Sequence, residues 1–534
     1  MLQSQPVTSS LAGRVRQAPL RLLRMARHPA AAVAAGIFLS RLAGLLRVRA
    51  FSFFFGLQSD AADAFNAAFR IPNLLQNLFG EGALSGSFIP VYSGLRARQR
   101  TAEAARVART VFALLAAAVS IISLLGVLFA PVVITGLAPG FTGAKRDLTI
   151  ALVRILFPGA GVLVLSAWCL GVLNVHGRFL LSYAAPIAWN IAMILTLVLF
   201  GRGRDLPSLA VYLAWGSVVG SLAQLGVQFA QAWSLSSGGP GLAISEPVRE
   251  AVRNFGPVLA SRGAVQLTAY IDTVIASLLP TGAVTGLTNT QLLYTLPVSL
   301  FGISISSAAL PTISADAHAE DAAERVRSRV AENACRIAYF VIPSAVAFLT
   351  IGDVLAATLF QTGRFTAADS RYVWGILAGS AIGLVAATTS RLYGVAHYAL
   401  GDTRRPLRFT LARLALATVL GYIGAVMLPG WIGLDSKWGA AGLTASAGIA
   451  GWVELLLLRR SLQSRVGDVT PPPSYLARLW VVAGGAGVAC RAVHVAAHGL
   501  GPLVTGAIIV PLYGALFLAG ARVAGLPFAG RLSR

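Results

Sequence analysis

The chain has 534 residues, of which 56% are hydrophobic and 12% charged, and its formal net charge is +23. A typical water-soluble domain is about 25% charged, so this composition predicts a protein that lies in a bilayer. Outer-membrane β-barrels are excluded because the apolar runs do not alternate with polar residues. A nucleic-acid partner is not expected, because the cations lie in short loops between the apolar runs.

The apolar runs predict an all-α polytopic membrane protein. A helix needs roughly 20 residues to cross the hydrocarbon, and the runs reach that length. Window length and loop charge together predict about 14 transmembrane helices. We expect these spans at 29–55, 61–92, 105–133, 148–175, 181–200, 207–233, 252–280, 284–315, 334–359, 370–396, 407–428, 438–459, 476–496 and 501–525.

Loop charge also predicts the orientation of the chain. Arginines cluster in the N-terminal tail and in alternate loops, after the second, eighth, tenth and twelfth spans. The loops on the other side, such as 58–60, 281–285 and 435–437, contain fewer cations. Because cytoplasmic loops are enriched in Lys and Arg, both termini are predicted to be cytoplasmic.

A weak internal repeat indicates two related halves. Pro72 and Pro90 recur as Pro297 and Pro311 roughly 220 residues later, a distance that covers six spans. The prediction is two six-helix lobes followed by two further helices. The predicted domains are a basic cytoplasmic tail (1–28), an N-lobe (29–235), a cytoplasmic inter-lobe loop (236–251), a C-lobe (252–460), a linker (461–475), the last two spans (476–526) and a C-terminal tail (527–534).

Charged residues inside the spans are the candidates for function, since each costs about 2.5–3.5 kcal/mol at the bilayer centre. Arg41 and Arg47 in the first span and Arg262 in the seventh lie mid-span with no acid nearby in the sequence. Arginine forms bidentate, charge-assisted hydrogen bonds and stays ionised when desolvated. We therefore expect these three residues to line a water-filled cavity that binds an anionic ligand.

Two interpretations apply to the other charged residues of the spans. They are Arg49, Asp60, Asp63, Arg70, Glu81, Asp272, Arg391 and Glu454. Ion pairing, or extension of the side chain towards the headgroups, is the simpler interpretation for Arg49 and Glu454. For Asp60 and Asp272 the structural and the functional interpretations are equally supported.

No motif indicates catalysis or a metal site. The sequence contains no Gly-rich phosphate loop, no His-Glu-x-x-His and no nucleophile elbow. The three cysteines lie far apart, which predicts neither a disulfide framework nor a metal site. We expect no cofactor, although a coupling ion or the membrane potential could drive transport.

Several longer motifs extend over about residues 30 to 525. They include Ser40-Arg41-Leu42-Ala43-Gly44 with Arg47, Asp63-Ala64-Phe65, Ala68-Phe69-Arg70-Ile71-Pro72-Asn73-Leu74-Leu75, Glu81-Gly82-Ala83-Leu84-Ser85, Gly363-Arg364-Phe365-Thr366 and Tyr398-Ala399-Leu400-Gly401-Asp402-Thr403. Together these motifs resemble the MurJ (MviN) lipid II flippase family of the MOP exporter superfamily.

The resemblance implies a fold and a task. It implies two six-helix lobes around a central cavity, with two further helices beside a lipid groove. It also implies that the chain, in the bacterial cytoplasmic (inner) membrane, moves the lipid-linked peptidoglycan precursor to the outer leaflet by alternating access. Other membrane lipids and cell-wall synthesis proteins are the further partners that it implies.

The resemblance also assigns roles to residues. Arg41 and Arg47 would contact the diphosphate, and Arg391 would be the basic residue of the tenth span. Asp63 and Glu81 would be the functional acids of the second span. With Arg70 and Asp272 they make up the predicted coupling and gating residues.

The chain departs from the family's pattern in two places. Gln76 and Asn77 stand where the family usually has two arginines, and Leu292 stands where it usually has one. We hypothesise that Arg262 supplies the missing charge.

These departures leave three alternative functions open. They are a flippase for another polyprenyl-diphosphate-linked glycan, a small-molecule antiporter of the same superfamily and a non-transporting cell-wall scaffold. A membrane-bound glycosyltransferase is disfavoured because no metal or acid cluster is evident.

Overall fold

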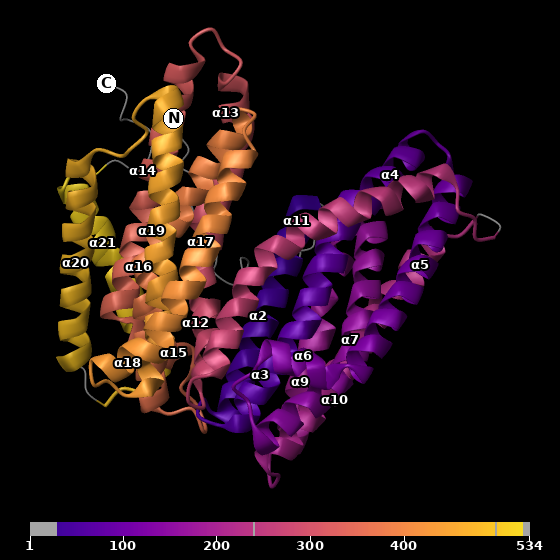
Figure 1. Ribbon diagram of the computed structural model, residues 1–534, viewed down its shortest axis with the longest axis horizontal. Helices are drawn as coiled ribbons and strands as arrows, with labels where there is room; N and C mark the ends of the chain where they lie inside the picture. Colours follow the sequence, from indigo (N-terminus) through magenta and orange to yellow (C-terminus); the bar gives the residue numbers. More distant parts are fainter. Residues whose placement is uncertain (1–28, 239–240, 497–498, 527–534) are drawn as a thin grey trace, which may run out of the picture. The chain divides into compact units, whose positions relative to one another are not determined.

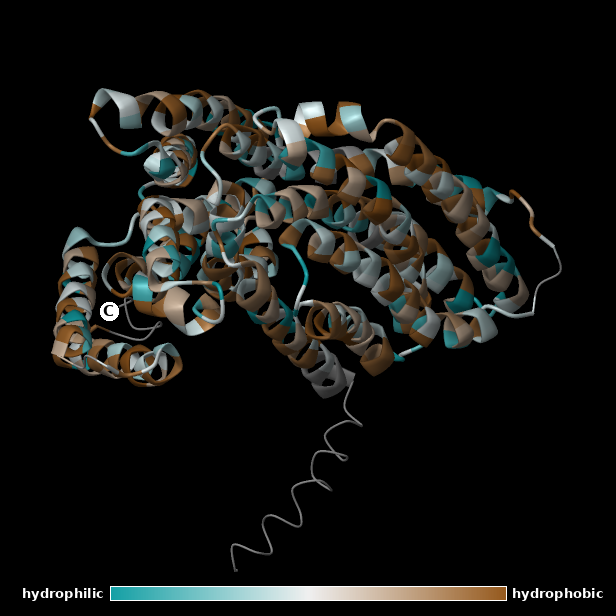
Figure 2. Ribbon diagram, turned by 90° about the horizontal axis from the view of Figure 1, so that it is seen from below, coloured by the Kyte–Doolittle hydropathy of each residue, from teal (hydrophilic) through white to brown (hydrophobic). Residues whose placement is uncertain are grey.

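The computed structural model describes residues 29–238, 241–496 and 499–526, and within these residues every regular element is a helix (Figure 1). Contacts divide the chain into two compact units. Of the described residues, unit 1 comprises 29–50, 68–130, 150–238 and 241–266, and unit 2 comprises 51–67, 131–149, 267–496 and 499–526. Hydrophobic residues recur along the helices of both units (Figure 2).

The first half of the chain forms long helices with short interruptions. Its elements are α2 (Pro29–Phe55), α3 (Asp60–Leu75), the π-helical η1 (Gln76–Leu84), α4 (Ser85–Ala97), α5 (Thr101–Leu128), α6 (Ala130–Leu137), α7 (Gly143–Val175), α8 (Phe179–Ala184), α9 (Pro186–Phe200), α10 (Leu206–Leu235) and α11 (Glu246–Ser277). Helices α2, α3, α6, α7 and α11 have residues in both units.

A proline breaks the predicted fifth span of unit 1 into α8 and α9. Pro186 has no N–H, so the carbonyl of Ser182 lacks its usual helical donor. The Gln228 side chain donates to this carbonyl at 3.1 Å. Gln228 in turn accepts a hydrogen bond from the Ser166 hydroxyl at 2.7 Å. Buried polar groups thus stabilise the break, as they must where no water is present.

The second half forms the elements of unit 2. They are α12 (Ala283–Pro297), the π-helical η2 (Val298–Ile303), α13 (Ser304–Asp316), α14 (Ala322–Thr350), α15 (Gly352–Phe360), α16 (Ala367–Ala399), α17 (Arg404–Tyr422), the π-helical η3 (Ile423–Met427), α18 (Leu428–Trp431), the 3₁₀ turn η4 (Ser436–Trp438), α19 (Gly439–Val466), α20 (Pro473–Ala496) and α21 (Pro502–Val523).

The two halves share one order of elements, which agrees with the repeat predicted from the prolines. Both α3–η1–α4 and α12–η2–α13 consist of a helix, a π-helical segment and a helix. Pro72 lies shortly before η1, and Pro297 lies directly before η2. A missing proline N–H disrupts the α-helical ladder, which accounts for this irregularity. A long, a short and a long helix follow in each half: α5–α6–α7 and α14–α15–α16.

Helices α20 and α21 pack against the outside of α14 and α15 (Figure 1). The hydroxyl of Tyr513 on α21 donates to the carbonyl of Pro343 on α14 at 2.8 Å. Arg491 near the end of α20 forms an ion pair with Asp353 on α15. From Trp480 onwards the exposed residues of α20 are apolar, with Val481 and Val488 exposed to 73% and 67%. Large exposed apolar residues of this kind require lipid around the helix.

Eleven helical segments of the described chain are long and apolar enough to cross a membrane. Three predicted spans, 29–55, 61–92 and 252–280, are helical but are not among the eleven. Each of the three includes residues whose side chains lie outside the described part of the structure. The multi-pass all-α prediction is confirmed, whereas the number fourteen stays a prediction.

Small residues allow α16 and α19 of unit 2 to approach closely. A Cβ added to Gly383 would lie 2.4 Å from the Cα of Gly448, which is backbone and cannot move aside. Nothing lies within 4 Å of the corresponding position on Gly394, on the same helix. Close packing through glycine is a common way to hold membrane helices together.

We predict that Gly383→Ala lowers the free energy of unfolding by about 1–3 kcal/mol, the range typical of overpacking. The measurement is the midpoint of thermal unfolding in detergent. Gly394→Ala is the matched control and should leave the midpoint unchanged or slightly higher. Equal midpoints for the two variants would contradict the close approach of α16 and α19.

Candidate functional site

A buried carboxylate near the start of α3 joins three segments that are distant in the sequence. The Asp63 side chain is 1% exposed and lies 2.9 Å from the Nζ of Lys145. The backbone N–H groups of Gly282 and Thr285 donate to it at 2.8 and 2.9 Å, and the Thr285 hydroxyl donates at 2.7 Å. The carboxylate thus accepts four hydrogen bonds, all within unit 2.

The chain folds so that the N-terminus of α12 faces this carboxylate. Gly282 precedes α12 with a φ of 98°, a left-handed conformation that favours glycine. The first N–H groups of a helix have no partner in the helix itself, and the helix dipole favours a negative charge there. Asp63 therefore caps α12 from another helix, where a Ser or Asp at the N-cap position would ordinarily do so.

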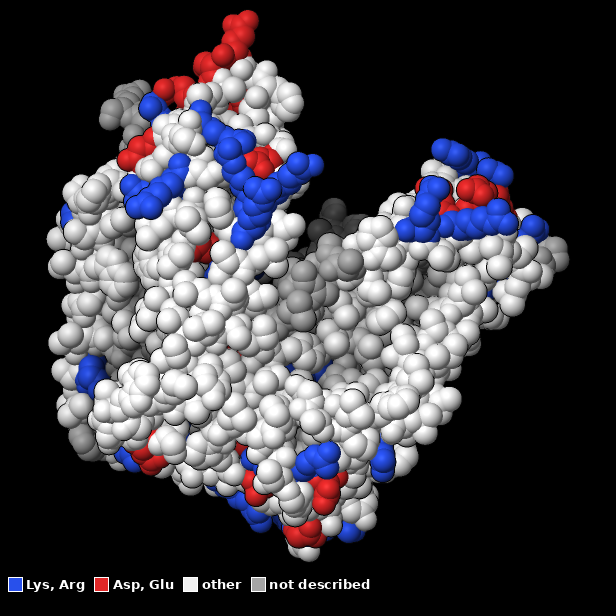
Figure 3. Space-filling view, viewed as in Figure 1, with Lys and Arg blue, Asp and Glu red and all other residues white. Residues whose placement is uncertain are grey.

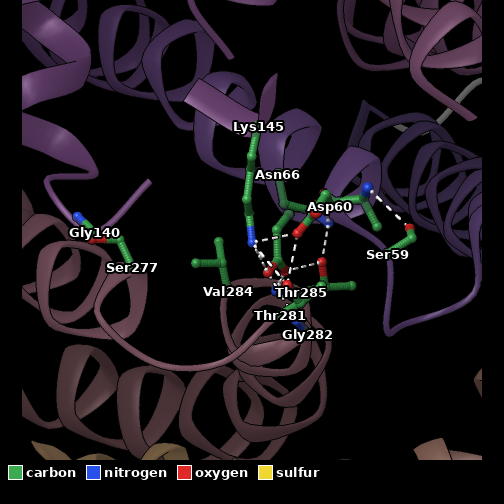
Figure 4. Close-up of polar contacts among 12 residues, drawn as sticks. Ser59, Asp60, Asn66, Gly140, Lys145, Ser277, Thr281, Gly282, Val284 and Thr285 are labelled. Carbon is green, nitrogen blue, oxygen red and sulfur yellow. Dashed lines mark hydrogen bonds and ion pairs between the residues drawn. The ribbon is translucent and has the colours of Figure 1, made fainter. Parts of the chain in front are cut away.

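A second carboxylate shares the Lys145 cation (Figure 4). The Nζ of Lys145 lies 3.1 Å from Asp60, and the Thr281 hydroxyl donates to Asp60 at 2.6 Å. The Thr281 hydroxyl, followed by Lys145, lowers the pKa of the Asp60 carboxyl. Asp60 stays ionised at neutral pH, so its contacts with Thr281 and Lys145 stabilise the fold there. This stabilisation is lost as the pH falls through the lowered pKa.

Further polar contacts surround these groups. The Asn66 amide donates to the Thr285 hydroxyl at 3.2 Å, which orients that hydroxyl towards Asp63 (Figure 4). Nearby, the N–H of Gly140 donates to the Ser277 hydroxyl at 3.1 Å. We call Asp60, Asp63, Asn66, Lys145, Thr281, Gly282 and Thr285 the Asp63 cluster.

Arg47 in unit 1 lies in a contrasting environment. Its Nε donates to the Oδ1 of Asn190 at 3.0 Å, and its guanidinium carbon lies 5.2 Å from the Trp189 ring and 5.6 Å from the Phe69 ring. No acid pairs with Arg47 in the described part of the chain. Because arginine has five N–H donors, four remain for another acceptor.

The partners of Arg47 are themselves held in place. Asn190 donates its own amide to the carbonyl of Pro186 at 2.9 Å, which directs its Oδ1 towards Arg47. The indole N–H of Trp189 donates to the carbonyl of Ser217 at 3.2 Å. A cation fixed by a neutral acceptor and two aromatic faces keeps its full charge, which suits a phosphate ligand.

The other predicted site residues are placed as follows. Arg41 on α2 and Arg391 on α16 are exposed, and neither forms an ion pair or hydrogen bond with the described residues. Arg70 on α3 and Asp272 on α11 are half-buried. Glu81 lies in η1 and Arg262 in α11, but their side chains lie outside the described part of the structure.

The Asp63 cluster contains two of the charged candidates from the sequence, Asp60 and Asp63, and the surroundings of Arg47 contain one. Asp63 is joined to Lys145 and α12, and Arg47 to Asn190 and the two aromatic rings. None of these partners is predicted from the sequence alone. The sequence offers one signal: apart from Lys437, every other basic residue counted among the 43 Lys and Arg is arginine. This signal does not distinguish Lys145 from Lys437, which pairs with Asp435 outside the cluster.

Glu454 on α19 is paired, as its structural interpretation predicts. Its carboxylate lies 3.0 Å from the Nε of Arg413 and accepts a hydrogen bond from the Thr410 hydroxyl at 2.7 Å. Both partners lie on α17 in unit 2, so this pair joins two neighbouring helices.

Solved structures show which class of protein has this fold. The chain is similar to a lipid II flippase MurJ in an inward closed conformation, with a TM-score of 0.72 and 20% identity over 92% of this chain and 98% of that one. It is also similar to an inward-facing multidrug-resistance MATE transporter of the MOP superfamily, with a TM-score of 0.64 and 15% identity over 79% and 95%. The fold is that of the MOP-superfamily transporters.

The sequence defines the family within that class. The model of the lipid II flippase MurJ family matches residues 51–505. A lipid II flippase MurJ of Burkholderia cenocepacia is 31% identical over 82% of this chain and 84% of its own length. A probable lipid II flippase MurJ of Bdellovibrio bacteriovorus is 30% identical over 80% of each. The chain belongs to the MurJ family.

We predict that Asp63→Asn destabilises the protein by about 3–5 kcal/mol, because it leaves Lys145 without its buried partner and places an amide N–H against N–H donors. Thermal unfolding in detergent measures this loss, and amide hydrogen exchange should become faster at Gly282 and Thr285. The control is Asp60→Asn, whose side chain is 61% exposed and should have a small effect. Equal effects at the two positions would contradict the central role of Asp63.

Proposed function

We propose that this chain is a lipid II flippase and not an enzyme. It carries undecaprenyl-diphosphate-linked disaccharide-pentapeptide from the inner to the outer leaflet of the bacterial inner membrane by alternating access, for peptidoglycan synthesis. Membership of the MurJ family supports this proposal, as do relatives described as lipid II flippases or probable lipid II flippases, which align over about four-fifths of the chain.

The environment of Arg47 is the main structural support for this proposal. A membrane helix retains a costly cation only where it is compensated, and no carboxylate compensates this one in the described residues. Its terminal nitrogens present a planar fork that matches two phosphate oxygens. In the proposal the diphosphate of the substrate supplies the missing negative charge.

The other predicted basic residues complete the proposed binding site. Arg41 lies six residues before Arg47 on α2 and is exposed without a described partner. Arg391 of unit 2 is likewise exposed and has no partner among the described residues. Arg262 remains the proposed substitute for the arginine that the family usually has at the position of Leu292.

The Asp63 cluster is the proposed gate. Its bonds are polar and short, so they can be broken and replaced by water without exposing apolar surface. Lys145 bridges two carboxylates and is 12% exposed, so the cluster lies close to the solvent boundary. Opening would separate α3 from the N-terminus of α12. Glu81, Arg70 and Asp272 are the further coupling or gating residues of the proposal.

The proposal includes an architecture of fourteen spans in two six-helix lobes with two further helices, with the predicted domain bounds and both termini cytoplasmic. A coupling ion or the membrane potential drives transport in this proposal, and cell-wall synthesis proteins contact the chain.

One observation favours a second candidate, a flippase for a different polyprenyl-diphosphate glycan. Leu292 on α12 is partly exposed where the family usually has an arginine. The test is complementation of a bacterial strain depleted of its own lipid II flippase. Restored growth supports lipid II as the substrate, whereas growth arrest with normal expression favours the second candidate.

We predict that Arg47→Ala lowers the rate of lipid II translocation in proteoliposomes by about tenfold or more, since a charge-assisted hydrogen bond contributes about 1.5–3 kcal/mol. Asn190→Asp is a sharper variant, because it places a carboxylate about one hydrogen bond from Arg47 and neutralises it. It should abolish translocation while the protein stays folded. Arg98→Ala, an exposed residue after α4, is the control. Full activity of Asn190→Asp would contradict the proposed role of Arg47.

We predict that a covalent link across the Asp63 cluster stops transport. Asp60→Cys and Thr281→Cys place two thiols where the oxygens now lie 2.6 Å apart, and a short bis-methanethiosulfonate reagent can join them. Translocation should fall to background and return on reduction.

Each single variant treated with the same reagent is the control for this experiment. The native cysteines, Cys169, Cys335 and Cys490, are buried, so they should react little. Undiminished translocation by the linked protein would show that α3 and α12 need not separate.

A further inference from the structure

A pocket with a volume of about 340 Å³ opens between α13 and α14 of unit 2. This volume lies at the lower end of the range of small-molecule sites. Its polar lining comes from Ser304 and Thr312 on α13 and from Arg329, Glu332, Asn333 and Arg336 on α14. None of these residues belongs to the Asp63 cluster or to the surroundings of Arg47.

The pocket lies where α14 enters the hydrocarbon. Helix α14 begins at Ala322, and no charged residue follows Arg336 up to its end at Thr350. Arg329 and Arg336 therefore mark the level of the lipid headgroups. Figure 3 shows charged side chains of both signs gathered at one end of unit 2, where the pocket-lining α13 and α14 meet their loop.

The charges in the pocket are balanced. Arg336 lies 2.5 Å from Glu332, and Arg329 lies 3.1 Å from Asp316. The side chains of Arg329 and Arg336 are 44% and 40% exposed, so their remaining N–H groups can donate to a ligand oxygen in the pocket. Glu332 has further lone pairs that can accept N–H donors.

The geometry points to a zwitterionic glycerophospholipid as the ligand, with its phosphate on Arg336 and Arg329 and its primary ammonium on Glu332. The phosphate can accept charge-assisted hydrogen bonds from both guanidinium groups. A primary ammonium has three donors, whereas a choline group has no N–H and a glycerol headgroup has no cation. Phosphatidylethanolamine fits this arrangement better than phosphatidylcholine or phosphatidylglycerol.

The apolar part of the pocket agrees with a lipid. Ile305 and Ala308 line it, and the neighbouring turns expose Leu300, Ile303 and Leu310 to between 38% and 60%. Acyl chains can follow this surface along α13 while the headgroup stays in the pocket. The inference does not depend on which lipid-linked glycan the protein transports.

The test measures how strongly each phospholipid binds the purified full-length protein in detergent, by native mass spectrometry and by the shift of the unfolding midpoint on lipid addition. Phosphatidylethanolamine should bind more tightly than phosphatidylcholine and phosphatidylglycerol. Arg336→Gln should weaken phosphatidylethanolamine binding by about tenfold. Arg325→Gln is the matched control, because Arg325 is exposed on the same helix and paired with Asp321 at 2.6 Å.

Two further variants test the role of Glu332 and the need for open space in the pocket. Glu332→Gln should remove the preference for phosphatidylethanolamine over phosphatidylglycerol. Ala308→Trp, at an exposed position, should fill the pocket and block the binding of both lipids. Equal binding of the three lipids to the unmodified protein, or no effect of Arg336→Gln, would overturn the inference. Undecaprenyl diphosphate binding that is lost in the same variants would assign the pocket to the transported lipid instead.

Discussion

The Asp63 carboxylate is the interaction on which the arrangement of α3, α7 and α12 depends. It neutralises Lys145 at the start of α7 and caps α12 through two backbone N–H groups. A charge buried to this degree is stable only while every lone pair is used, so the cluster behaves as one unit. That property suits a contact that must be either fully made or fully broken, because a half-open state would leave Lys145 and Asp63 unpaired.

Arg47 is also held by specific contacts, but none of its partners carries a negative charge. Its partners are a neutral amide and two aromatic rings, which fix the side chain but leave its charge uncompensated. The ion pair of Glu454 with Arg413 and the pair of Asp63 with Lys145 show that this chain pairs charges where they serve structure. In the proposed mechanism, the contrast separates residues that hold conformations from one that is available to an anionic substrate.

The sequence predicts more of the fold than of the site. Apolar runs locate the helices, because length and hydropathy are properties of a single segment. The recurrence of Pro72 as Pro297 predicts two related halves, but it does not predict the π-helical segments. Asp63 and Arg47 are recognisable as costly charges inside spans. Their partners are not, because Lys145, Asn190 and Thr285 lie 82 to 222 residues away and no local pattern links them. Capping of α12 by a residue of another helix also has no signature within α12.

The most direct test of the central claim is the distance between the two sides of the Asp63 cluster in a lipid bilayer. Spin labels at Gln58 and Thr281, both exposed, report the separation of the turn before α3 from the turn before α12 by pulsed electron paramagnetic resonance. The account predicts a short distance without substrate and a second, longer distance when lipid II is supplied. A single short distance under every condition, in protein that translocates lipid II, would contradict it.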